Sequence, residues 1–308
     1  MDVLTVWKGK EVFEKLAEIY GQLYLEPGEE GEELYPEVVL KGRMPEVKKL
    51  DHFHMTDEDS CCLAQTPAGG VMVITLHDRR DFETFLQIMG KKCRRVDIPA
   101  TQGASILDGV INHRKIEAHR DEFFRKAGEA GKEPDQLEWM QERSRFLEDK
   151  KNYRDALIIL SVGPYSGVPA DKAGYAEQDW LSISQTIRMY HECTHFVCRR
   201  LFPDKIDAIW DELAADAVGI YAALGRYDLG LAGTVLGIRD GKYTGGRLEN
   251  YVPEDEPDQE QFIDRILPGV LSAMEEIGSL SEKQEMEPFE LAVRLEKEKE
   301  ALWKPEQA

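Results

Sequence analysis

The sequence has no long hydrophobic run, and this absence limits what the chain can be. Its longest apolar stretches, such as residues 156–160, are far shorter than the roughly 20 residues that a membrane-spanning helix needs. The first sixteen residues, MDVLTVWKGKEVFEKL, mix acidic and basic side chains and contain no continuous apolar segment. They therefore do not resemble a cleaved secretory signal. We expect a soluble, cytoplasmic protein that has no membrane partner.

The chain is also short of basic residues and of paired cysteines. It holds 39 Lys and Arg against 59 Asp and Glu, which gives a formal net charge of −20. Because affinity for nucleic acid depends on Lys and Arg that neutralise phosphates, we expect no nucleic-acid partner. The 5 cysteines include no Cys-x-x-Cys pair, so a four-cysteine zinc knuckle is excluded. Their odd number indicates reduced thiols in a reducing compartment.

The pattern of apolar residues predicts an α+β protein, with short strands in the first half and mostly helices after residue 178. Turn formers at 67, 69 and 70 predict a β-hairpin, and a stretch rich in Gly, Glu and Pro at 26–36 ends the first helix. Helices are expected over 8–25, 81–89, 112–127, 135–150, 178–201, 204–224, 258–279 and 282–302, and strands over 61–65, 71–76, 93–98 and 156–161.

The chemistry of the chain is concentrated in His191-Glu192-Cys193-Thr194-His195, an HExxH motif. Residues four apart on a helix share one face, so the two imidazoles can bind one zinc ion. Glu192, next to the first ligand, is then placed to act as the general base. Apart from Glu192, residues 189–198 carry no acid, Lys or Arg, which predicts a buried helix. The alternative is a core helix with two hydrogen-bonded histidines.

The next predicted helix offers a third ligand. Pro203 breaks the chain between the two helices, and Asp204 is a candidate N-cap. Because the connection is short, Glu212 can return to the two histidines, and Asp216, one turn later, can accept the free N–H of a ligating histidine. Asp211 is an alternative third ligand, and Cys198 a weaker one.

HExxH followed by Glu-x-x-x-Asp on the next helix resembles the gluzincin clan of zinc metallopeptidases, the thermolysin-like arrangement, over about residues 155–225. The resemblance implies that His191, His195 and Glu212 bind Zn²⁺. It implies that Glu192 is the catalytic base. It also implies that Asp216, which does not bind the metal itself, orients a metal-binding histidine. The expected activity is hydrolysis of a peptide or protein substrate.

The same resemblance implies an architecture, a small mixed sheet with an edge strand packed on the HExxH helix and a mainly helical C-terminal half. Residues 151–308 would form a zincin-like catalytic region with a helical tail, and residues 1–150 an α/β region that forms the other wall of the cleft. Such an edge strand pairs with an extended peptide. Residues 156–161 are either that edge strand or a central one, and the following GPYSGVP can form a rim of the cleft.

Three questions stay open at the level of sequence. No histidine follows His195, so a donor for the oxyanion must come from another residue type, with Tyr221, Arg226, Tyr227, Tyr243 and Arg247 as candidates. Residues 98–114 either line a cleft with His113 or form a turn before a helix. The rival functions are a zinc amide or ester hydrolase that does not act on peptides, and a metal-stabilised binding or regulatory protein with a degenerate peptidase site.

Overall fold

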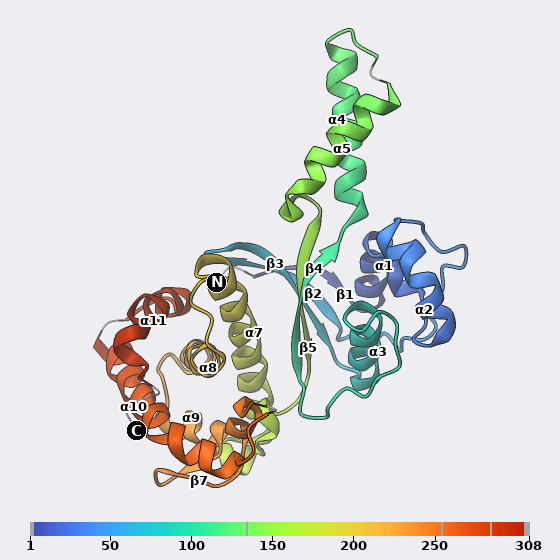
Figure 1. Cartoon of the computed structure of the whole chain (residues 1–308). Helices are drawn as coiled ribbons and strands as arrows, with labels where there is room; N and C mark the ends of the chain where they lie inside the picture. Colours follow the sequence, from blue (N-terminus) through green and yellow to red (C-terminus); the bar gives the residue numbers. More distant parts are fainter. Residues whose placement is uncertain (1–2, 134, 254, 284, 305–308) are drawn as a thin grey trace.

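The protein is a mixed α+β structure built around one five-stranded sheet (Figure 1). The computed structural model describes residues 3–133, 135–253, 255–283 and 285–304. The strands are β1 (Val3–Lys8), β2 (Ser60–Thr66), β3 (Gly69–Leu76), β4 (Ala104–Ile111) and β5 (Arg154–Ser161). Their order is β1-β2-β3-β5-β4, and only the β3–β5 pair is parallel. The predicted hairpin of β2 and β3 is confirmed.

The position of β5 corrects one expectation. Residues 156–161 form a central strand, hydrogen-bonded to β3 on one side and to β4 on the other. An edge role for this segment is therefore wrong, and β4 is the edge strand on this side of the sheet. The apolar run of β5 fits a strand that is covered on both faces.

Most helices lie where the apolar periodicity predicts them, and the C-terminal half is mainly helical, as expected. Shorter elements lie between them. Strands β6 (Ile238–Arg239) and β7 (Lys242–Tyr243) form a two-stranded sheet. The short 3₁₀ helices are η1 (Gly21–Tyr24), η3 (Lys150–Asn152), η4 (Tyr165–Gly167) and η5 (Arg247–Tyr251), and η2 (Pro36–Leu40) is a π-helix. The helices are α1 (Lys10–Ile19), α2 (Glu29–Tyr35), α3 (Arg79–Met89), α4 (His113–Glu129), α5 (Gln136–Glu148), α6 (Ala170–Ala173), α7 (Glu177–Leu201), α8 (Ala208–Leu224), α9 (Leu229–Leu236), α10 (Gln259–Lys283) and α11 (Pro288–Leu302).

Two hydrophobic cores lie on the two faces of the sheet, because side chains alternate along a strand. Ile158 and Leu160 of β5 belong to a core that also contains side chains of α7, α8, α10 and α11. Leu157 and Ile159, the intervening residues, belong to a second core with α1 and α3. Figure 1 shows the same division, with α7 and α8 on one side of β5 and α1 and α3 on the other.

Several local predictions were wrong for identifiable reasons. Residues 93–98 form no strand, since Lys92 and Cys93 have φ angles of 57° and 60°, which no strand adopts. The Gly- and Glu-rich segment at 26–36 contains helix α2. Of the two alternatives for residues 98–114, the turn is wrong, because residues 104–111 are strand β4, whereas residues 99 and 101–106 do line a cleft. A φ of 79° at Gly109 produces the irregular register of β4. The N-cap of α8 is Asp207, not Asp204.

The connection between β4 and β5 is a helical hairpin of α4 and α5 that projects away from the sheet (Figure 1). Neither helix contains a buried residue. The five-stranded sheet contains β1 to β4 from the region expected at residues 1–150 and β5 from the region expected at residues 151–308. The division at residue 150 stays a prediction. Across the described part of the chain, we find no helix of sufficient length and hydrophobicity to traverse a bilayer.

Candidate metal centre

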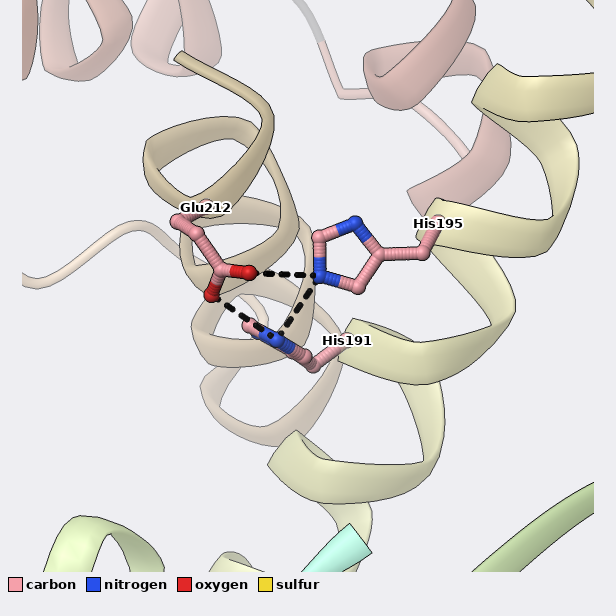
Figure 2. A group of neighbouring side chains, drawn as sticks. All are labelled: His191, His195 and Glu212. Carbon is pink, nitrogen blue, oxygen red and sulfur yellow. Dashed lines mark hydrogen bonds and ion pairs between the residues drawn. The ribbon is translucent and has the colours of Figure 1, made fainter. Parts of the chain in front are cut away.

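The HExxH motif lies on α7, and the expected third ligand lies on α8. His191 and His195 are almost fully buried, with 6% and 7% of their surface exposed. Their Nε2 atoms are 3.0 Å apart, and both face the carboxylate of Glu212 (Figure 2). Glu212 Oε2 is 3.3 Å from Nε2 of His191, and Oε1 is 3.2 Å from Nε2 of His195. Three candidate ligand atoms therefore converge on one point.

These separations fit a zinc ion. Zn–N and Zn–O bonds of about 2.0–2.2 Å at tetrahedral angles place ligand atoms about 3.3 Å apart. Two imidazole nitrogens and one carboxylate oxygen also form a donor set that zinc accepts in catalytic sites. The side chains of His191, His195 and Glu212 thus match zinc in both chemistry and spacing.

Electrostatics couples the three side chains. Burial disfavours a charged His191, but hydrogen bonds to Asp216 and Glu212 outweigh burial and raise the pKa of His191 to about 9. Burial alone would also raise the pKa of Glu212. Its hydrogen bonds to His191 and His195 instead hold that pKa well below its usual range. Glu212 is thus a carboxylate, the form that binds metal.

Asp216 is at the centre of the polar network behind His191. It is 2% exposed, and its Oδ1 accepts hydrogen bonds from Nδ1 of His191 at 2.9 Å and from the Tyr165 hydroxyl at 2.6 Å. Arg247 forms an ion pair with the same oxygen. Burial opposes ionisation, but Arg247 and His191 lower the pKa of Asp216. The contact fixes the His191 ring with Nε2 toward Glu212, the position expected for a residue that orients a ligand.

Glu192 lies beside this group in a cleft of about 750 Å³. No hydrogen-bond or ion-pair partner of its carboxylate is found among the described residues, so it is free to act on a molecule in the cleft. Tyr165 and Ser166 of the GPYSGVP segment also line the cleft, as expected for a rim. The cleft is lined by Pro99, Thr101, Gln102, Gly103, Ala104, Ser105, Ile106, Tyr165, Ser166, Arg188, His191, Glu192, His195, Arg199, Glu212, Gly246, Arg247, Glu249, Asn250 and Tyr251.

Of the five downstream residues considered as oxyanion donors, one lies at this group of side chains, together with another residue. Arg247 lies 3.6 Å from Glu212 Oε2, and Tyr251, which we did not predict, donates to the same oxygen at 3.2 Å. Both come from η5. The other candidates have different contacts, since Tyr221 bonds Met286, Arg226 pairs with Asp228, Tyr227 is buried in the core, and Tyr243 bonds Gly246 and Glu249.

The alternative ligands lie outside the converging group. Asp211 accepts from the backbone N–H of Asp207, at 3.4 Å. Burial raises the pKa of the Cys198 thiol, and Glu296 also raises it. His113 is hydrogen-bonded to the carbonyl of Val39, so it does not reach the cleft.

Two further clusters of possible metal ligands occur among the described residues, Glu26 with Asp51 and His52, and His54 with Asp78 and Asp81. In the second cluster, both carboxylates already accept hydrogen bonds from backbone N–H groups. Asp78 caps α3, and Asp81 accepts from the N–H groups of His54 and Met55. The group on α7 and α8 is the buried one that opens into a cleft.

The chain belongs to a family of unknown function, DUF7005, which it matches over residues 4–291. Neither the curated proteins nor the solved structures contain a match to it.

Proposed function

We propose that this protein is a zinc-dependent hydrolase of the gluzincin type, a metallopeptidase that cleaves peptide bonds. The proposal rests on one arrangement, in which two buried imidazoles and one carboxylate converge at 3.0–3.3 Å beside the unpaired carboxylate of Glu192. A buried core helix needs hydrogen-bonded histidines, but it does not need a free acid next to them in a cleft.

Each residue has a distinct part in the proposal. His191, His195 and Glu212 would hold the zinc ion, which supplies a Lewis acid and lowers the pKa of water. Glu192 accepts a proton from the attacking water and delivers it to the leaving amine. Asp216 keeps the His191 ring in place through Nδ1–H. Arg247 and Tyr251, which already contact Glu212, are the candidate donors to the developing oxyanion.

The edge strand β4 supports a peptide as substrate. Residues 104–106 line the same cleft as His191 and Glu192, and among the described strands β4 is paired only with β5. In this proposal the HExxH helix packs beside β4, and an extended peptide pairs with its free edge through backbone hydrogen bonds. Strand β4 thus takes the role that we first considered for residues 156–161.

Metal content tests the ligand set. We expect about one zinc per chain by elemental analysis of the purified protein. His191→Ala and Glu212→Ala should lose it, while His119→Ala should keep it, because His119 pairs with Glu142 on the α4–α5 hairpin. The wild type is supplied with zinc, and excess zinc is then removed. If it holds no zinc after this treatment, the HExxH motif is better explained as part of a core helix.

Activity tests the reaction. Cleavage of a mixed peptide pool, followed by mass spectrometry, should be about 100- to 10,000-fold slower for Glu192→Gln at unchanged zinc content. Glu177→Gln, in the first turn of the same helix, is the matched control and should keep full activity. Small amide and ester substrates in the same assay separate a peptidase from the other zinc hydrolases. Equal rates for Glu192→Gln and wild type would leave a metal-stabilised binding protein as the better explanation.

A further inference from the structure

The face of α7 that holds the HExxH motif also presents a positive charge to the cleft. At helical spacing, the α7 residues that line the cleft are Arg188, His191, Glu192, His195 and Arg199. Arg188 lies three residues before His191, an axial distance of about 4.5 Å. A cation thus stands one turn from the proposed metal ligands, in a chain whose net charge is −20.

Arg188 is buried, with 5% of its surface exposed, yet among the described residues its guanidinium donates hydrogen bonds to neutral groups alone. Nη1 donates to the carbonyls of Ser161 at 2.9 Å and Gly163 at 3.2 Å, and Nη2 donates to Pro164 at 3.1 Å. A guanidinium has five N–H donors. The two that remain, on Nε and Nη2, form one edge of the guanidinium, the geometry that receives a carboxylate in a bidentate pair.

The backbone of Gly103, which precedes β4, packs close to this edge. A Cβ atom at residue 103 would come within 2.8 Å of both Nε and Nη2 of Arg188. Only glycine therefore lets the chain pass so close to the guanidinium without displacing it. Gly103 and Arg188 both line the cleft, so this part of the guanidinium lies at the cleft wall beside the start of β4.

Arg188 also has no acidic partner within 4.0 Å in the described part of the chain, in contrast to Arg247, which pairs with Asp216 and Glu212. Burial lowers the pKa of Arg188, and the charge of Glu192, one turn away on α7, offsets this only in part. Burial of an arginine among carbonyl groups costs free energy that an anion would recover.

We propose that Arg188 is a binding site for a carboxylate of the substrate, which the remaining N–H groups on Nε and Nη2 would hold at the cleft wall beside Gly103. The inference rests on the proposed function, since it assigns a substrate class to the same cleft. Because an extended peptide rises about 3.3 Å per residue, a carboxylate at Arg188 places Glu192 within one or two residues of it. The substrate would be cut close to its C-terminal carboxylate or to an Asp or Glu side chain.

The test is a binding measurement that needs no turnover. Zinc-loaded Glu192→Gln protein is titrated by calorimetry with four acetylated pentaalanine peptides. One has a free C-terminal acid, one is amidated, and two are amidated with Glu or Gln at the fourth position. We expect the free acid or the Glu peptide to bind roughly 10- to 100-fold more tightly than its neutral counterpart. Tighter binding of the free acid would identify a terminal carboxylate as the ligand of Arg188. Tighter binding of the Glu peptide would identify an acidic side chain.

Two further substitutions in this protein assign the effect to Arg188. Arg188→Met should abolish the preference for the charged peptide, and Arg200→Met, which removes the same charge from a residue outside the cleft, should keep it. Circular dichroism checks that Arg188→Met is folded. If that variant is not folded, the comparison of the four peptides with the protein that retains Arg188 still tests the proposal. Equal affinity for all four peptides, or no measurable binding of any, would overturn the carboxylate site. Cleavage by wild-type enzyme is measured separately, so a failure of the proposed function is recognised on its own.

Discussion

Asp216 should be the most sensitive side chain of the site, because three groups depend on one of its oxygens. Tyr165 and His191 donate hydrogen bonds to Oδ1 and Arg247 pairs with it, all in a region where Asp216 is 2% exposed. Asp216→Ala would leave the guanidinium of Arg247 buried without its main counter-ion. It would also remove the acceptor that fixes the His191 ring.

The expected loss is about 3–5 kcal/mol of the free energy of unfolding, the usual cost when one partner of a buried ion pair is removed. Urea denaturation followed by circular dichroism measures it, with EDTA present so that metal affinity does not contribute. Asp108→Ala is the control. Asp108 is 67% exposed and lies 4.0 Å from Arg200, so its loss should change the free energy by less than about 0.5 kcal/mol.

A double substitution sharpens this prediction. In Asp216→Ala with Arg247→Met, neither charge is left unpaired, so the double variant should be more stable than the sum of the two single losses predicts. The coupling energy should lie at about 0.5–3 kcal/mol. A loss below about 1 kcal/mol for Asp216→Ala, or strictly additive losses, would refute the view that the pair is buried and interdependent.

Other predictions concern the metal and the helix contact. EDTA should lower the melting temperature of the wild type, and zinc at about 100 times its dissociation constant should restore about 2.7 kcal/mol, while His191→Ala should respond to neither. Gly219→Ala should cost about 1–3 kcal/mol and weaken zinc binding, because a Cβ there would lie 2.7 Å from the carbonyl of Ile187. Gly128→Ala, on a helix with open space around it, should instead stabilise the protein by about 0.5–1 kcal/mol in denaturation experiments.

The residues that the sequence could identify are those whose relation is local. His191 and His195 are one helical turn apart, and Glu212 and Asp216 have the same spacing on the next helix. A short connection then forces the two helices to be neighbours. Periodicity and connection length are therefore enough to predict which four side chains meet, and the structure brings all four together.

The residues that the sequence could not identify reach the site from distant segments. Tyr165 lies in a turn after β5, Arg247 and Tyr251 come from η5, and none has a spacing that relates it to the motif. The order of the strands is equally non-local, since β4 and β5 are separated by the 42 residues 112–153, which contain the α4–α5 hairpin. An apolar run such as that of β5 indicates burial but does not indicate which strands lie beside it.

The centre depends on the register of two antiparallel helices more than on either motif. His195 meets Glu212, His191 meets Asp216, and the carbonyl of Ile187 approaches Gly219, so each step down α7 matches one step up α8. The close approach at Gly219 lies about one turn beyond the Asp216 contact. A side chain there would move the helices apart by pushing on the backbone of α7. Because the described contacts of the Glu212 carboxylate are with the two histidines, Tyr251 and Arg247, we expect its distances to the histidines to lengthen. Gly219 on α8 is therefore expected to support the candidate metal centre, although it contributes no ligand atom.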